Sequence, residues 1–287
     1  MSGLVGWLRN PWGRPRWLGV VTLLYIAWSI LPVGIAVLFA FNNGRSRTTW
    51  QGFSTRWFTG ATGSVFHDPA LQSAFKHTLF LGVLCVAVAT PLGVALALGL
   101  QRWRGPGSGV VNTMMLLPLV TPEIVMGVAL LLLFLKIFPG LGLGTTAQAI
   151  GQVTFTLSYV VVIVRGRLVS IGREYEEAAA DLGAPPHDQL LRVLLPLLAP
   201  AIIASAAVVF ALSIDDFVVT QYLSSDASTT TVPMLLYASA RGAPTPALNA
   251  IATVMLVVTL LTLAFAFFVY RRFAGGSDAA VAAALEV

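Results

Sequence analysis

The sequence predicts an all-α polytopic membrane protein with six transmembrane helices. Of its 287 residues, 57% are hydrophobic and only 10% are charged, whereas soluble domains carry roughly 25% charged residues. Six windows also hold the run of about 20 apolar residues that a helix needs to cross a bilayer. We expect these spans at residues 18–41, 77–100, 110–135, 148–168, 196–221 and 247–270.

The first span follows a basic segment. Arg9, Arg14 and Arg16 precede an apolar stretch of about 24 residues. This stretch is longer than the core of a signal peptide, which has about 7–15 residues. We therefore expect it to stay in the membrane as the first span.

The distribution of Lys and Arg predicts the orientation. Six spans put both termini on one side of the membrane, and a cytoplasmic placement leaves eleven of the 17 Lys and Arg inside and six outside. Short cytoplasmic loops carry an excess of these residues. We therefore expect a cytoplasmic N-terminal segment at 1–17, a membrane domain at 18–270 and a cytoplasmic tail at 271–287.

The loop between the first two spans is external on this topology. It covers residues 42–76 and is rich in aromatic side chains, which suit the boundary between membrane and water. The residues expected there are Trp50, Phe53, Trp57 and Phe58.

The fourth span is the least apolar of the six. Its polar residues form a stripe, which we expect to face the interior of the helix bundle rather than lipid. The stripe consists of Gln148, Gln152, Thr154, Thr156 and Ser158.

The sequence lacks the motifs of an enzyme. A phosphate-binding G-x-x-x-x-G-K-[ST] loop needs a Gly-Lys pair, but Lys76 and Lys136 are the only lysines and neither follows a glycine. The three histidines are far apart, no G-x-S-x-G motif occurs, and the single Cys85 lies in an apolar run, where we expect inert packing. We assign no catalytic, metal-binding or cofactor-binding residue, and the scattered cations do not form a nucleic-acid groove.

One polar passage stands between two apolar spans. Residues 174–200 read EYEEAAADLGAPPHDQLLRVLLPLLAP and begin with four of the chain's twelve acids. Acids favour the start of a helix, and Gly183 suits the left-handed position that follows a helix ending near Leu182. Pro186 can begin a second helix. We expect two short helices that meet at an elbow outside the membrane; on its own this pattern is also typical of a solvated hairpin.

The spacing within this passage distinguishes the two interpretations. It reads E-A-A at 177–179, then Gly183 after three residues, then V-L-L-P at 193–196 after nine more. This resembles the pattern E-A-A-x3-G-x9-I-x-L-P of the membrane subunits of binding-protein-dependent ABC importers, with Val193 in place of Ile.

The resemblance implies a type I ABC importer permease fold whose cytoplasmic loop, residues 170–195, seats a coupling helix in a separate ATPase subunit. That ATPase would bind ATP and Mg, so no cofactor is expected in this chain. The residues that the resemblance assigns to ATPase coupling are Glu177, Ala178, Ala179, Leu182, Gly183, Ala184 and Pro196.

Other stretches are similar to the spermidine/putrescine permeases, in particular to the second of their two membrane subunits. They are 50–58, 117–134, 211–225 and 229–253. The resemblance implies polyamine import across a bacterial plasma membrane. The implied partners are membrane lipid, a second homologous permease, two ATP-binding subunits and an extracytoplasmic substrate-binding protein.

Three acids within spans are candidates for the substrate pathway. Glu123, Asp215 and Asp216 are costly in a bilayer unless they face a watery cavity, and a polycation would favour them. Asp215 lies about 28 Å from the start of the fifth span, toward its external end, and neighbouring helical residues point about 100° apart. One aspartate is therefore expected to face a ligand while the other caps a helix or pairs with a neighbour. Glu123 is equally consistent with a charge in the first turn of a broken helix.

Alternative functions stay open at this point. Related importers move other solutes, such as ferric ions and phosphonates. A secondary transporter would use the acids as ion sites, but such proteins usually show repeated halves and more spans. An intramembrane enzyme would need a nucleophile or metal set that the sequence does not show.

Overall fold

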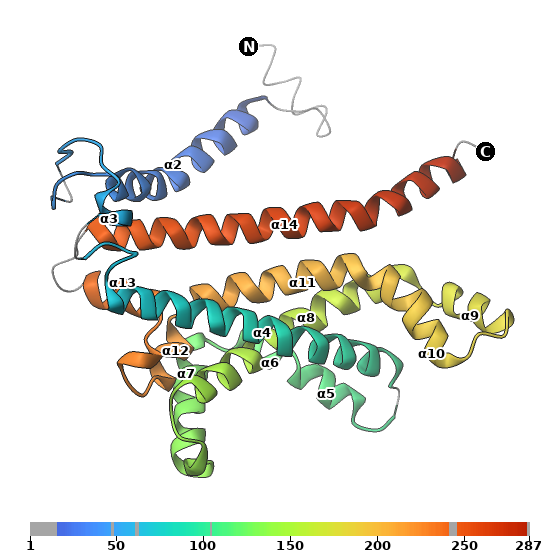
Figure 1. Cartoon of the computed structure of the whole chain (residues 1–287). Helices are drawn as coiled ribbons and strands as arrows, with labels where there is room; N and C mark the ends of the chain where they lie inside the picture. The colour runs from blue at the N-terminus through green and yellow to red at the C-terminus, as the bar shows by residue number, and fades with distance from the viewer. Residues whose placement is uncertain (1–15, 47–48, 61–62, 104, 241–245, 286–287) are drawn as a thin grey trace, which may run out of the picture. The chain divides into compact units, whose positions relative to one another are not determined.

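The computed structural model describes residues 16–46, 49–60, 63–103, 105–240 and 246–285 (Figure 1). Residues 1–15 of the predicted N-terminal segment lie outside this part of the chain. The chain forms two compact units. Unit one comprises Met1–His67 and Pro244–Thr253, and unit two comprises Asp68–Ala243 and Val254–Val287.

The described residues confirm the all-α class. Apart from an isolated bridge between Asn42 and Phe53, the regular structure in the described ranges is helical. The helices are α2 (Arg16–Ala40), α3 (Arg56–Thr59), α4 (Pro69–Arg102), α5 (Ser108–Met114), α6 (Leu117–Val120), α7 (Glu123–Leu132), η1 (Leu133–Ile137), η2 (Pro139–Leu141), α8 (Thr145–Ile171), α9 (Glu174–Asp181), α10 (Pro186–Asp188), η3 (Gln189–Leu194), α11 (Leu195–Asp215), α12 (Val218–Leu223), η4 (Ala227–Thr229), α13 (Val232–Ala240) and α14 (Pro246–Leu285).

Five of the described helices are long and apolar enough to cross a membrane, and a sixth span results if one bent pair counts as a span. These segments correspond to the six predicted windows, with four differences in where a helix begins, breaks or ends. The last helix, α14, also continues to Leu285, beyond the predicted end of its span at 270.

The second span begins earlier than predicted. α4 starts at Pro69 rather than at residue 77, because the Asp68 side chain accepts hydrogen bonds from the amides of Ala70 and Leu71. Proline at the first helical position has no amide hydrogen to leave unpaired. Capping therefore extends the helix into a stretch that hydropathy alone does not mark.

The third span is broken rather than continuous. The segments Ser108–Val120 and Glu123–Ile137 are bent by 110°. Pro122 cannot donate to a helical hydrogen bond, and a proline pushes the preceding residue out of the helical region. Thr121 accordingly has ψ 128°, and a new helix starts at Glu123.

The fifth span ends earlier than predicted and starts earlier too. Helix α11 stops at Asp215, and Asp216 has ψ 119° before α12 begins. At the other end, α10 and the π-turn η3 join α11 without a gap, so the segment Pro186–Asp215 forms one helical run of 30 residues. The second helix of the predicted elbow is therefore the beginning of the span and not a separate short helix.

In unit one, a polar side chain organises the turn after α2. Asn42 is fully buried, and its amide nitrogen donates to the carbonyls of Ser46 and Thr49. The indole nitrogen of Trp57 donates to the Asn42 carbonyl at 2.7 Å. Trp57 is therefore buried in this loop fold rather than lying free at an interface, whereas Phe53 is 71% exposed.

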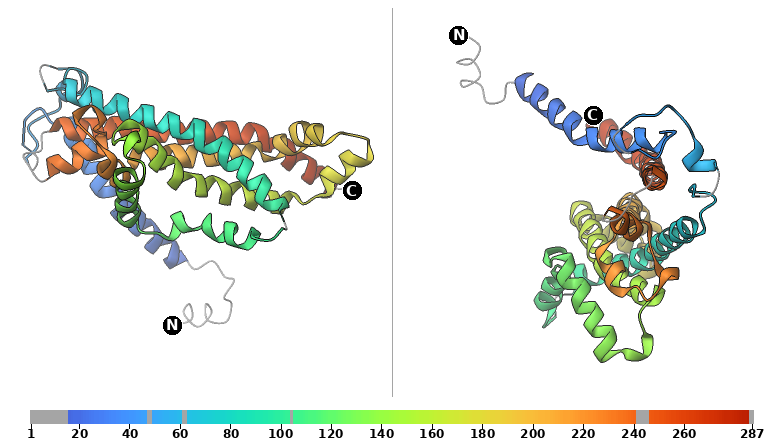
Figure 2. Two further views of the ribbon diagram at one scale, coloured as in Figure 1. Left: turned by 90° about the horizontal axis from the view of Figure 1, so that it is seen from below. Right: turned by 90° about the vertical axis from the view of Figure 1, so that its left-hand side faces the viewer.

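The core of unit two lies between α4, α8 and α11, which run side by side (Figure 2). Cys85, Val160, Leu198 and Val209 are each fully buried there. Small residues allow the close approach: a Cβ added to Gly93 of α4 would lie 2.5 Å from the Cβ of Val160. Membrane helices commonly pack through such small residues, because lipid supplies no hydrophobic drive between helices.

Candidate functional site

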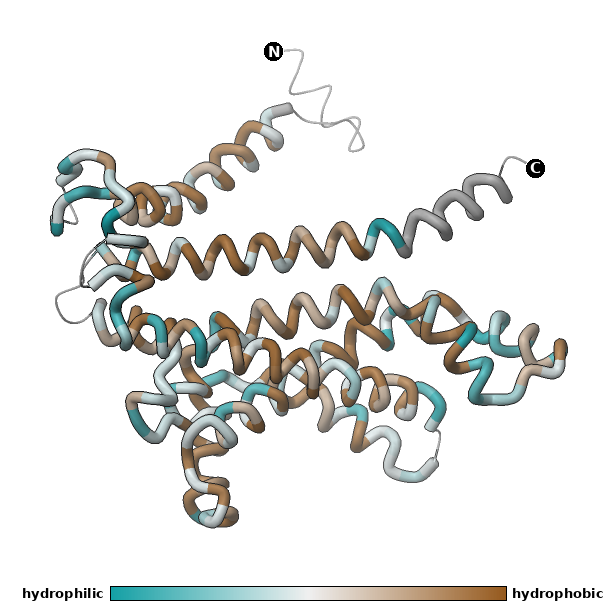
Figure 3. Tube along the Cα trace, in the orientation of Figure 1, coloured by the Kyte–Doolittle hydropathy of each residue, from teal (hydrophilic) through white to brown (hydrophobic). Residues whose placement is uncertain are grey.

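Unit two has polar groups at both ends of the α4–α8–α11 core. We call the end with α9 and α10 the elbow end, and the end with Asp215 and α12 the acid end. Along the core the described helices are predominantly hydrophobic, and hydrophilic residues gather around α9 and α10 (Figure 3). Each predicted site residue lies at or near one of these two ends.

Backbone hydrogen bonds fix the turn at the elbow end. The Gly183 amide donates to Ala180 and the Ala184 amide donates to Ala179, at 2.8 and 3.0 Å. This pair of bonds is the Schellman arrangement, in which the residue after the C-cap is left-handed. Gly183 has φ +83° as the arrangement requires, so the predicted turn is observed at the predicted residue.

The side chains of the elbow divide into a covered set and an outward set. Ala179 and Ala184 are half-buried, and the Gln189 amide group donates to the Ala184 carbonyl at 2.7 Å. Leu182 is 90% exposed, which is unusual for a large apolar residue. The outward set also includes Glu177, Ala178, Gly183 and Pro196.

One contact that the sequence reading did not identify ties the elbow to the bundle. Arg102, the last residue of α4, donates to the Glu176 carboxylate at 2.6 Å. A second pair, Arg192 and Asp188 at 3.2 Å, lies within the start of the long helical run. The Arg192–Asp188 pair has i, i+4 spacing and could be predicted from the sequence. The Arg102–Glu176 pair joins residues 74 positions apart and could not.

At the acid end the two aspartates have different environments. The Asp216 carboxylate accepts hydrogen bonds from the amides of Val219 and Thr220, at 3.1 and 2.9 Å, and so caps α12. Asp215 is exposed. Asp216 is therefore the aspartate that caps a helix, as expected of one of the two. That Asp215 faces a ligand stays a prediction.

Glu123 is exposed and opens α7, directly after the break at Pro122. Helix α7 packs against α12, which is the helix that the Asp216 carboxylate caps. The structure therefore brings Glu123 and the α11–α12 break to the same end of unit two, although about ninety residues separate them in sequence.

The polar stripe of the fourth span faces inward, as predicted for most of its members. Gln148, Gln152, Thr156 and Ser158 are at most 2% exposed. Thr154 is the exception: it is exposed, and its hydroxyl donates to the Ile150 carbonyl of its own helix.

Gln152 links α8 to the break between α11 and α12. Its amide nitrogen donates to the Ser213 carbonyl and to Asp216, at 3.1 and 3.2 Å. Its carbonyl oxygen accepts from the Ser213 hydroxyl at 2.6 Å and from the Cys85 thiol at 3.2 Å. Cys85 is thus packed in the core, with a weak hydrogen bond in addition to the apolar contacts expected.

Gln148 makes the equivalent link one helical turn away. Its amide nitrogen donates to the carbonyls of Thr220 and Thr229, at 3.0 and 2.9 Å. Its carbonyl oxygen must then be the acceptor toward His77 Nε2, 2.8 Å away, so that this ring nitrogen carries the proton. The i, i+4 spacing of Gln148 and Gln152 was visible in the sequence, but their partners, 61 to 81 residues away, were not.

A capped turn positions Thr229 for this contact. The Asp226 carboxylate accepts from the Ser228 amide and hydroxyl at the start of η4. These hydrogen bonds and one from the Ser225 hydroxyl hold the pKa of Asp226 below its usual range. The turn is therefore fixed by local bonds and presents its Thr229 carbonyl to Gln148.

Residues 89–275 match the family model of the binding-protein-dependent transport system inner membrane component. The chain belongs to this family. The matched residues include α8, the elbow and the acid end. The chain is accordingly a non-catalytic permease component of an ABC transporter, in which a separate subunit hydrolyses ATP.

Similar sequences cover most of the chain. It is 36% identical over 251 residues to the putrescine transport system permease protein PotI of Escherichia coli (strain K12), which covers 86% of this chain and 88% of the relative. It is 34% identical over 243 residues to the spermidine/putrescine transport system permease protein PotC of the same strain, covering 85% and 89%. The molybdenum transport system permease protein ModB of Mycobacterium bovis is 32% identical over 80% of this chain and 85% of the relative.

Solved structures support the fold. A bacterial ABC transporter involved in the import of alginate has a TM-score of 0.71 at 19% identity and covers 94% of this chain and 98% of the other. The MetNI methionine ABC transporter has a TM-score of 0.56 at 16% identity, over 70% and 93%. The chain therefore has the ABC importer permease fold that the motif at residues 177–196 led us to expect.

Proposed function

We propose that this permease imports polyamines such as putrescine and spermidine. The observation that carries the proposal is the 36% and 34% identity to PotI and PotC over more than four fifths of the chain. The acid end supports the same class of solute, because exposed Asp215 and Glu123 offer carboxylates to a cation. An ionised carboxylate attracts an ammonium group more strongly in a low-dielectric vestibule than in bulk water.

The proposed assembly has this chain beside a second homologous permease, with two ATP-binding subunits and an extracytoplasmic substrate-binding protein. ATP and Mg belong to the ATP-binding subunits. The elbow supplies the coupling element, since it combines a turn fixed by backbone bonds with outward side chains such as Leu182 and Glu177. An apolar residue that is 90% exposed is what a protein partner would cover.

The proposed orientation puts the N- and C-termini and the elbow in the cytoplasm of a bacterial inner membrane. It rests on the excess of Lys and Arg on that side. In a Cys85→Ala background expressed without the ATP-binding subunits, a cysteine at Leu182 should resist an impermeant thiol reagent in intact cells and react after permeabilisation. A cysteine at Leu141, next to the start of α8 at the acid end and 51% exposed, should react in both. The reverse pattern would invert the topology.

Transport itself is tested with the whole complex. The two permeases and the ATP-binding subunits, in proteoliposomes with the binding protein, should accumulate labelled putrescine or spermidine only when ATP is present. Molybdate serves as the contrasting solute, because one of the similar permeases is named for molybdenum transport. Uptake of molybdate without uptake of either polyamine would contradict the proposed substrate but not the proposed importer assembly.

A further inference from the structure

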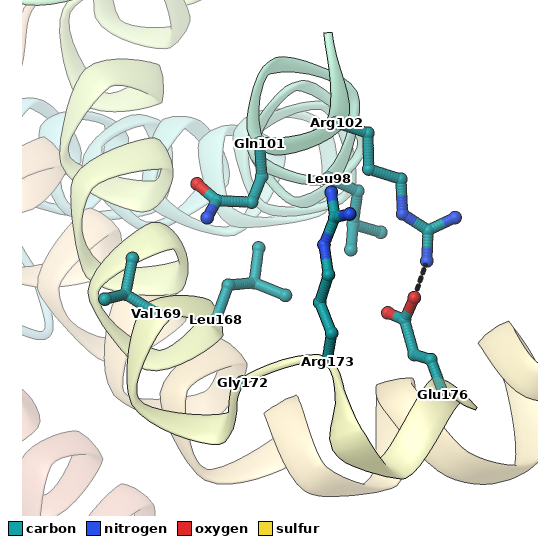
Figure 4. Close-up of a pocket in the computed structure, with 8 residues that line it drawn as sticks. All are labelled: Leu98, Gln101, Arg102, Leu168, Val169, Gly172, Arg173 and Glu176. Carbon is teal, nitrogen blue, oxygen red and sulfur yellow. Dashed lines mark hydrogen bonds and ion pairs between the residues drawn. The ribbon is translucent and has the colours of Figure 1, made fainter. Parts of the chain in front are cut away.

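The elbow end contains a cavity that has no role in the proposed transport of polyamines. It has a volume of about 170 Å³ and lies between the last turn of α4, the end of α8 and the start of α9 (Figure 4). Its polar lining comes from Gln101, Arg102, Arg173 and Glu176, and its apolar lining includes Leu98 and Val169.

The cavity carries an excess of positive charge. Two guanidinium groups line it against one carboxylate, and that carboxylate, on Glu176, already accepts from Arg102 at 2.6 Å. The Arg173 guanidinium makes no hydrogen bond or ion pair with the residues the structure describes, and it extends toward the end of α4 between Gln101 and Arg102 (Figure 4). One cation is thus available to an anion from outside the chain.

The position of the cavity matches the level of lipid headgroups. Arg102 ends a helix long enough to cross the membrane, and Trp103, which follows it, is 42% exposed. Val169, on the apolar side of the cavity, is 68% exposed near the end of another spanning helix. A site with cations on one side and exposed apolar residues on the other fits an amphipathic ligand better than a small inorganic ion.

We propose that this cavity binds the phosphate group of an anionic phospholipid, with Arg173 and Arg102 on the phosphate and the acyl chain beside Val169. The proposal rests on the cytoplasmic placement of the elbow, where anionic lipid headgroups attract basic pockets between helices. Arg173 directly precedes α9, and Glu176 lies in its first turn. A bound lipid would therefore steady the coupling element and make transport depend on the anionic lipid content of the membrane.

Lipid binding is measured on the whole importer in nanodiscs of phosphatidylcholine with a minor fraction of phosphatidylglycerol, by native mass spectrometry of the retained lipids. Arg173→Gln should weaken phosphatidylglycerol retention about fivefold, the effect of one cation near an anionic lipid. Arg192→Gln is the matched control, because Arg192 is a cation of the same elbow that does not line the cavity. Its retention should equal that of the wild type.

Glu176→Gln separates a binding site from a merely structural ion pair. Removing the competing carboxylate should strengthen phosphatidylglycerol binding, whereas a purely structural role predicts no gain. A parallel titration in detergent with inorganic phosphate tests the source of the anion: Arg173-dependent binding of phosphate alone would uphold the anion site and replace the lipid with a free ion. Equal retention by wild type, Arg173→Gln and Glu176→Gln would overturn the proposal without touching polyamine transport.

Discussion

The two ends of unit two are built in different ways. At the elbow end, backbone bonds around Gly183 hold the turn, and most predicted side chains point outward. At the acid end, side-chain amides from α8 hold two helix breaks through contacts with residues 61 to 81 positions away. The fold of the elbow should therefore tolerate side-chain changes except at its glycine, whereas the fold of the acid end should be sensitive to the loss of a single buried amide.

The largest effect on uptake is expected at Gly183. In Gly183→Val a β-branched residue would have to adopt φ near +83°, and left-handed backbone costs an ordinary residue about 1–2 kcal/mol. We expect ATP-driven uptake to fall roughly tenfold or more, with the protein still present in the membrane. Gly99→Ala is the control, because a Cβ there meets no atom within 4 Å. Wild-type uptake by Gly183→Val would remove the elbow from the coupling mechanism.

The largest effect on thermal stability is expected from Gln152→Leu. The change leaves the buried Ser213 hydroxyl without its partner, which costs about 1–3 kcal/mol. It also removes one of the hydrogen bonds to Asp216, which keeps those from Val219 and Thr220. Thermal unfolding in detergent should occur at a lower temperature, and uptake should fall with it. Gln221→Leu alters an exposed glutamine of α12 and should have little effect. Equal losses in the two variants would show that the buried network is not what holds the break.

A smaller effect, and one on transport rather than stability, is expected from Asp215→Asn. Asp215 is exposed and caps no helix, so removing its charge should raise the KM for a polyamine several-fold, by about 1 kcal/mol of lost attraction, at unchanged unfolding temperature. Asp216→Asn should instead lower the unfolding temperature and leave the KM nearly unchanged, because the Asp216 carboxylate caps α12. Glu123→Gln should resemble Asp215→Asn if it lines the same path. A pathway role for Asp215 is excluded if only Asp216→Asn changes uptake.

The smallest effect is expected at the exposed pair of Arg192 and Asp188. Such i, i+4 pairs contribute about 0.3–0.5 kcal/mol, and the Arg192 side chain is 78% exposed. Arg192→Gln should therefore leave the unfolding temperature nearly unchanged. A shift as large as that of Gln152→Leu would contradict the contrast between the two ends.

Hydropathy and spacing were sufficient to predict the spanning helices, the turn at Gly183 and the inward face of Gln148 and Gln152. The break at Pro122 was one of the alternatives considered for Glu123, and the start at Asp68 was also within reach, because proline and a capping aspartate act locally. A cap by one of the two aspartates was expected as well, but which of them caps depends on where the following helix begins. The pairing of Arg102 with Glu176 depends on how α4 and α9 are brought together, and no local pattern encodes it.

The helical run from Pro186 to Asp215 connects the elbow end directly to the acid end. At about 1.5 Å per residue its 30 residues extend for about 45 Å. Leu198 and Val209, within the run, are buried in the core. A tilt of about 5° about the middle of such a rod moves each tip by about 2 Å in opposite directions. Movement of the elbow at Pro186 would thus reach the Asp215 end through this one helical run.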